Sequence, residues 1–120
     1  MLELLHRGGG EKIINGMFRA DPVRAIEPVV HLLHSRFLKG TSKVSAAWNL
    51  SKCYGAEYYR GIFIECMNDP DKEVREKAAY FVSAQDPHPD INLALKRMVR
   101  SETDLLPRIH AVDKLLIRHG

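Results

Sequence analysis

The sequence lacks the features that mark membrane, secreted and disulfide-stabilised proteins. No apolar run approaches the roughly 20 residues that a membrane-spanning helix needs. The start, MLELLHRGGGEK, has an acid at position 3 and does not resemble a signal peptide. Two cysteines are too few for a disulfide framework, so we expect free thiols. The sequence therefore predicts a cytoplasmic protein without a membrane segment.

Charge of one sign and catalytic motifs are also scarce. The 18 Lys and Arg residues against 15 Asp and Glu residues give a net charge of +3, which does not by itself indicate a nucleic-acid-binding protein. We find no phosphate-binding loop, paired carboxylates, nucleophile elbow or Cys-His arrangement. His31 and His34 share one helix face but have no third metal ligand at a suitable spacing. The sequence predicts no enzyme activity and no metal or cofactor site.

Apolar residues at helical spacing are what the sequence does contain, and strand-like alternation is weak. Asp69 or Asp71, and Thr103 or Asp104, are suitable helix caps. Pro28 is expected in the first turn of a helix that begins near residues 25–27. The helices are expected at 11–19, 25–39, 42–54, 57–68, 71–85, 90–101 and 105–118.

The stretch NDPDKEVREKAAYFV (68–82) is repeated in its layout by ETDLLPRIHAVDKLL (102–116). This alignment places Arg75 on Arg108, and a weaker upstream copy, TSKVSAAWNLSKCYG (41–55), places Lys43 under Arg75. A helix pair of this length cannot bury its own apolar face, so we expect the pairs to stack on one another. The predicted organisation is one domain, 1–120, with an N-terminal helix and linker (1–24) and repeat units at 25–56, 57–87 and 88–120.

The segment IFIECMNDPDKEVREKAAYFV resembles a HEAT-type helical repeat, in which an apolar helix and a D-x-D turn precede V-R-x-x-A-A-x-x-L. The residues that match are Val74, Arg75, Ala78, Ala79 and Val82. The spacing between the copies is shorter than in the larger HEAT class and is similar to that of compact bacterial and phycobilin-lyase-type HEAT-like repeats. The resemblance implies an all-α fold, a short right-handed α-solenoid of about three helix pairs with an extra N-terminal helix. The resemblance also implies a possible function as a lyase or chaperone for a tetrapyrrole chromophore, which no residue of this sequence supports.

The repeated turn is interpreted as scaffold. Asp69 or Asp71 lies within one turn of Arg75 and is expected to form an ion pair with it across the inter-helix turn. The adjacent small residues Ala78 and Ala79 allow a neighbouring helix to approach closely. We favour this structural role over anion binding for Arg75 and Arg108.

A partner-binding surface is predicted on the second helix of each unit. Trp48 and Tyr80 occupy equivalent positions, on the side of the helix that is opposite the small residues and that faces the concave surface in HEAT-like arrays. An exposed aromatic pair beside lysines is a credible anchor for a partner peptide or an unstacked base. The alternative is that Trp48 belongs to the core, in a stripe with Val44. The lysines expected beside the aromatic pair are Lys43, Lys52 and Lys77.

A second cluster lies in the run YGAEYYRG, where three tyrosines, among them Tyr58, and Arg60 surround a turn. It is interpreted either as a stacking or hydrogen-bonding patch contiguous with Lys52 or as a seal between two units. Cys53 and Cys66 flank the same turn, and two buried thiols are favoured over a redox couple.

The sequence therefore predicts a non-enzymatic adaptor or regulator that binds a protein partner. The alternative is a nucleic-acid-binding protein, because residues 31–60 contain five basic residues and one acid, Glu57. Self-association through the terminal helices is a further expectation, because the last helix is apolar over much of its circumference. The basic residues of the middle segment are Arg36, Lys39, Lys43, Lys52 and Arg60, and the apolar residues of the last helix are Leu105, Leu106, Ile109, Leu116 and Ile117.

Overall fold

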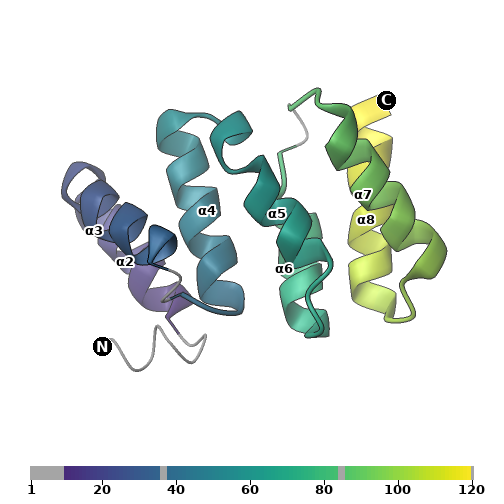
Figure 1. The fold of residues 1–120 in the computed structure, drawn as a ribbon, viewed down its shortest axis with the longest axis horizontal. Helices are drawn as coiled ribbons and strands as arrows, with labels where there is room; N and C mark the ends of the chain where they lie inside the picture. Colours follow the sequence, from purple (N-terminus) through teal and green to yellow (C-terminus); the bar gives the residue numbers. More distant parts are fainter. Residues whose placement is uncertain (1–9, 36–37, 84–85, 120) are drawn as a thin grey trace.

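The computed structural model describes residues 10–35, 38–83 and 86–119, and this part of the chain contains seven α-helices, one 3-10 helix and no strand (Figure 1). The predicted all-α class is confirmed for these residues. The helices are α2 (Glu11–Ala20), α3 (Pro22–His34), α4 (Thr41–Tyr54), α5 (Arg60–Met67), α6 (Lys72–Phe81), α7 (Pro89–Ser101) and α8 (Leu105–His119), with the 3-10 helix η1 (Ala56–Tyr58) before α5.

The helices are arranged in two layers (Figure 1). In one layer α2, α4, α6 and α8 follow one another, and each contacts the next. In the other layer lie α3, α5 and α7, of which α5 contacts α7. Helices adjacent in sequence also pack together across the layers, as α5 does on α6 and α7 on α8. As a result, α4 and α6 are packed between two helices of their own layer, whereas α8 packs mainly on α6 in that layer.

The core lies between the two layers and depends on small residues where the helices approach closely. Ala46 and Ala47 on α4, and Ala78 and Ala79 on α6, are fully buried. A larger side chain at these positions would force the helices apart, which typically costs about 1–3 kcal/mol. Polar contacts hold α2 on α4 at one end of this layer, where the Asn49 side chain donates to Asn15 Oδ1 over 2.8 Å.

The predicted start of the second helix was wrong. The helix α3 begins at Pro22, because the Asp21 side chain caps it by accepting a hydrogen bond from the Arg24 N–H and Pro22 stands in its first turn. Pro28 therefore lies inside the helix and not in its first turn. The ring removes one helical hydrogen bond donor at an exposed position, where water can satisfy the freed carbonyl.

The predicted ends of the central pair also differ from the structure. The helix α5 begins at Arg60, after η1, and α6 ends at Phe81 because Val82 takes an extended ψ of 140°. The start of α6 follows the expected cap, since Asp71 Oδ1 accepts a hydrogen bond from the Glu73 N–H over 2.9 Å. The prediction that α6 continues to residue 85 was therefore too long.

The helix α8 exposes six large apolar side chains. They are Leu105, Leu106, Ile109, Val112, Leu116 and Ile117, with exposed fractions of 38% to 70%. The described residues include no helix that is both long enough and apolar enough to cross a bilayer.

Candidate functional site

A groove of about 800 Å³ crosses the layer that contains α4, α6 and α8. Its aromatic part comes from Trp48 on α4 and from Tyr80 and Phe81 on α6. A smaller cleft of about 180 Å³ shares Trp48 and Phe81 with it. The groove is therefore formed by the second helices of the predicted units. The residues that line it are Trp48, Tyr80, Phe81, Val82, Ser83, His110, Asp113, Lys114 and Ile117.

Trp48 lies between a ring and a cation. Its ring centroid is 4.9 Å from that of Phe81, with the planes tilted by 50°, and the Lys52 ammonium lies 3.6 Å from the centroid of the indole. Such a cation–π contact stabilises the orientation of the indole by roughly 0.5–1 kcal/mol at an exposed site. The sequence allowed two alternatives for Trp48, an exposed anchor or a core residue. Trp48 is partly buried, so its exposure lies between the two.

Tyr80 continues the aromatic surface toward α8. It is 55% exposed, and its ring makes edge contacts with Phe81 at 4.9 Å and with His110 at 5.1 Å. Phe81 thus connects Trp48 to Tyr80, although it was not among the predicted site residues. Its position, one residue after Tyr80 on the same helix, was the sequence feature that could have predicted its place in the groove.

The charged residues of the groove come mainly from α8. Lys114 donates a hydrogen bond to the Tyr80 carbonyl oxygen over 2.8 Å, and its partial burial lowers the pKa of the ammonium. His110 Nε2 lies 3.4 Å from Glu76 Oε1. Asp113 is exposed beside them. The groove therefore combines an aromatic surface with a cation that is partly removed from water.

The three lysines that were predicted beside the aromatic pair have different neighbours in the structure. Lys52 lies on Trp48, as described, and Lys77 is partly buried on α6. Lys43 lies elsewhere, in an ion pair of 2.8 Å with Glu65 on α5. The structure therefore brings Trp48, Tyr80 and Lys52 together and holds Lys43 away from them.

Tyr58 and Arg60 do not lie in the groove. Tyr58 is 70% exposed and lines a separate cleft of about 470 Å³ with Val30, His34, Tyr54 and Tyr59. Arg60 binds the Asp86 carboxylate through two hydrogen bonds of 2.8 Å, and the Asp86 side chain is almost fully buried. These hydrogen bonds hold the pKa of Asp86 below its usual range. Arg60 therefore anchors the segment before α7, and Lys52 does not line the tyrosine cleft.

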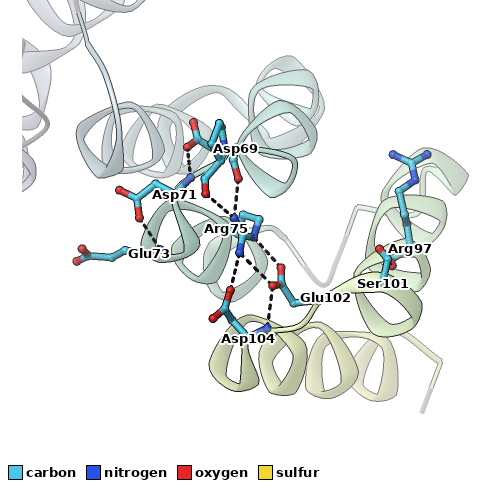
Figure 2. A network of polar contacts seen from close by, with 9 residues as sticks. Asp69, Asp71, Glu73, Arg75, Arg97, Ser101, Glu102 and Asp104 are labelled. Atoms are coloured by element: carbon cyan, nitrogen blue, oxygen red, sulfur yellow. Dashed lines mark hydrogen bonds and ion pairs between the residues drawn. The ribbon is translucent and has the colours of Figure 1, made fainter.

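Arg75 lies at the centre of a polar cluster that connects two successive inter-helix turns (Figure 2). Nε and one terminal nitrogen bind Glu102, and the same terminal nitrogen binds Asp104 Oδ2 over 2.8 Å. The other terminal nitrogen donates to the carbonyl oxygens of Asp69 and Pro70. All five N–H groups of the guanidinium are thereby used, which leaves no donor for an external anion.

The expected ion pair of Arg75 with the Asp69 or Asp71 carboxylate was wrong. The carboxylates of Asp69 and Asp71 accept hydrogen bonds from the backbone N–H groups of Asp71 and Glu73 instead. The guanidinium reaches Glu102 and Asp104, which occupy the positions of Asp69 and Asp71 in the next copy of the repeated turn. The ion pairs therefore connect one turn to the next and do not close a single turn.

The remaining candidates do not form a site in the described part of the chain. Cys53 is exposed and Cys66 is buried, and both are free thiols, so the expectation of two buried thiols was wrong for Cys53. Burial raises the pKa of the Cys66 thiol to about 12. His31 and His34 are exposed, and no group of three or more metal-ligating side chains occurs among the residues that the structure describes.

Comparisons of the chain with protein-family models, with curated proteins and with solved structures find no match.

Proposed function

We propose that this chain is a non-enzymatic, cytoplasmic adaptor or regulator that binds a segment of a partner protein in the groove across α4, α6 and α8. The observation that carries the proposal is the continuous aromatic surface of Trp48, Phe81 and Tyr80, which lines this groove and includes the exposed ring of Tyr80. Aromatic side chains in a concave site are the residues that most often dominate the binding free energy of protein interfaces.

The same proposal includes a HEAT-like α-solenoid as the architecture. Its support is the equivalence of positions: Lys43 and Arg75, which align with each other in successive copies of the repeat, each bind an acid that belongs to the following helix pair. The successive contacts of α2, α4, α6 and α8 agree with a repeated layer. In such an array the second helices form an extended concave surface that suits a peptide or helix of a partner.

The basic residues of the middle segment favour a protein partner over nucleic acid. Lys43 is paired with Glu65, Arg60 with Asp86, and Lys52 lies on the Trp48 ring. Lys39 is exposed, and Arg36 lies outside the described residues. Binding to phosphates would require several free cations on one surface, so the local excess of charge in 31–60 supports the nucleic-acid alternative only weakly.

Affinity capture from cytosol with and without nuclease treatment, followed by binding of each purified candidate partner to variants, tests this proposal. Trp48→Ala and Tyr80→Ala should weaken the purified complex by at least about tenfold, the usual effect of removing an anchor residue. Tyr58→Ala is the matched control, because Tyr58 is an exposed tyrosine outside the groove. Equal affinity of all three variants, or capture of nucleic acid alone, would overturn the proposal.

A further inference from the structure

Lys114 is a cation in the groove whose charge is not neutralised by any carboxylate of the described residues. Its ammonium donates to the Tyr80 carbonyl oxygen, and it has no carboxylate within ion-pair distance among the described residues. An ammonium has three N–H donors, so two remain for other acceptors. Desolvation lowers the pKa of Lys114, and the nearby charge of Arg118 adds to this effect.

The described groups around Lys114 do not provide the missing counter-ion. Arg118 on the same helix donates to Asn92 and to the carbonyls of Ser83 and His88. Glu76 on α6 lies near His110 instead, and Asp113 is exposed without an ion pair to Lys114. A partly buried cation without a carboxylate partner costs free energy that an anionic ligand would recover.

The rest of the groove suits an apolar group of the same ligand. Trp48, Phe81 and Tyr80 present ring surface and edges, and Ile117 adds an exposed aliphatic side chain at the same groove. This surface suits an aromatic or large aliphatic side chain, and a single ammonium beside it suits one carboxylate. A nucleic acid would need several cations in a row, which the groove does not offer.

We propose that the groove binds a partner peptide that combines an aromatic or large aliphatic side chain with an Asp or Glu, whose carboxylate accepts a hydrogen bond from Lys114. This inference rests on the proposed function, because it specifies the chemistry of the segment bound at the same groove. Trp48, Phe81 and Tyr80 supply the apolar contact, and Lys114 determines the preference for an acid.

Selection from a library of random displayed peptides on the purified full chain tests this inference. The peptides enriched on the wild type should carry an acid near an aromatic or large aliphatic residue. Lys114→Met keeps an unbranched stem and removes the charge, so it should weaken the selected peptide about tenfold, as expected for a charge-assisted hydrogen bond. A peptide in which the acid is replaced by its amide should bind the wild type and Lys114→Met equally.

The matched control is Lys96→Met, because Lys96 is an exposed lysine on α7 outside the groove. Enriched peptides without an acid, or an affinity loss in Lys114→Met that persists for the amide peptide, would overturn the inference while leaving the proposed function in place. If no enriched peptide loses affinity for Trp48→Ala or Tyr80→Ala, the proposed function falls as well.

The outer face of α8 leads to a second inference that does not depend on the groove. Leu105, Ile109, Val112 and Leu116 follow one another at alternating helical spacings of four, three and four, and all are exposed. This spacing forms a straight apolar seam on a helix. Because it reads the same in both directions, the seam is complementary to itself in an antiparallel pair.

We infer that two copies of this chain associate through antiparallel α8 helices related by a two-fold axis between His110 and Ala111. Leu105 would then meet Leu116 of the second copy, and Ile109 would meet Val112 of the second copy. Arg108 would lie level with Asp113 of the second copy, so opposite charges and not like charges come to one level. A two-fold contact of this kind closes on itself and covers the apolar face of both chains.

Light scattering over a range of concentrations tests this pairing. The wild type should approach twice the mass of one chain, and Leu116→Glu should weaken the association at least about tenfold, since it buries a charge in the seam. Leu93→Glu is the control, because Leu93 is similarly exposed on α7 and lies outside the seam. A wild-type mass equal to one chain at every concentration, or a dimer unaffected by Leu116→Glu, would overturn the inference.

Discussion

The Arg75 cluster and the Trp48–Tyr80 groove differ in how far their polar and apolar groups are satisfied within the chain. In the cluster, every N–H group of Arg75 has an acceptor, and Glu102 is almost fully buried. In the groove, Tyr80 keeps more than half of its surface exposed, and Lys114 has one carbonyl acceptor. The difference indicates that the cluster stabilises the packing of the helices, whereas the groove offers unsatisfied groups to a ligand.

The largest expected effect is the loss of stability on removing the centre of the cluster. Arg75→Ala leaves the buried Glu102 carboxylate without its guanidinium partner, so we expect the free energy of unfolding to fall by about 2–3 kcal/mol. The matched control is Arg108→Ala, because Arg108 is the equivalent residue in the next unit and is exposed. It should change the stability by less than about 0.5 kcal/mol. Urea denaturation followed by circular dichroism measures both, and equal losses would contradict the scaffold role.

The second effect is a loss of stability in acid. Hydrogen bonds from Arg75 and Arg60 lower the pKa values of Glu102 and Asp86 below their ordinary values of 4.5 and 3.8. Because the folded-state pKa values are lowered, this stabilisation is present above the ordinary values and is lost as the pH falls through the folded-state values.

We therefore expect urea midpoints that stay level near neutral pH and fall steeply below about pH 4. In Arg75→Ala the contribution of Glu102 is absent, so the decline should be shallower than in the wild type. Parallel declines in the two proteins would show that Arg75 does not lower the pKa of Glu102.

The third effect is a loss of binding with little loss of stability, the reverse of the effect expected for the cluster. Tyr80→Ala removes an exposed ring, so it should change the free energy of unfolding by less than about 1 kcal/mol. It should nevertheless weaken the binding of a groove peptide at least about tenfold. Isothermal calorimetry and urea denaturation of the same variant give the two values. A large loss of stability would mean that the aromatic surface is part of the core.

The smallest effect concerns the two thiols. Burial raises the pKa of Cys66 to about 12, so it should not react with iodoacetamide near neutral pH, whereas the exposed Cys53 should. Mass spectrometry should find one modified thiol in the folded protein and two after denaturation. Modification of Cys66 at the rate of Cys53 would indicate that the contact between α5 and its neighbours opens readily.

Local patterns predicted the helices well because apolar spacing and caps are properties of neighbouring residues. The sequence predicted the turn at Asp71, the close packing at Ala78 and Ala79, and the apolar surface of α8. The start of α3 differs from the prediction because the Asp21 cap and Pro22 begin the helix earlier, and the helix continues through the exposed Pro28.

The contacts that were mispredicted or missed depend on residues far apart in the sequence. Arg75 binds acids 27 and 29 residues away, whereas local spacing pointed to the carboxylates of its own turn. Lys114 reaches the groove because α8 packs against α6, and its partner carbonyl belongs to Tyr80, 34 residues earlier. The predicted pair Trp48 and Tyr80 lines one groove, but Phe81 between them was not anticipated.

The most direct test of the groove as the binding site uses the emission of Trp48, the only tryptophan in the chain. A peptide recovered by selection on the full chain is titrated into the wild type, Tyr80→Ala and Tyr58→Ala. We predict a saturable change in emission for the wild type and Tyr58→Ala, and a midpoint at least about tenfold higher for Tyr80→Ala. Binding that leaves the Trp48 emission unchanged, or that is equally tight in all three proteins, would contradict the account.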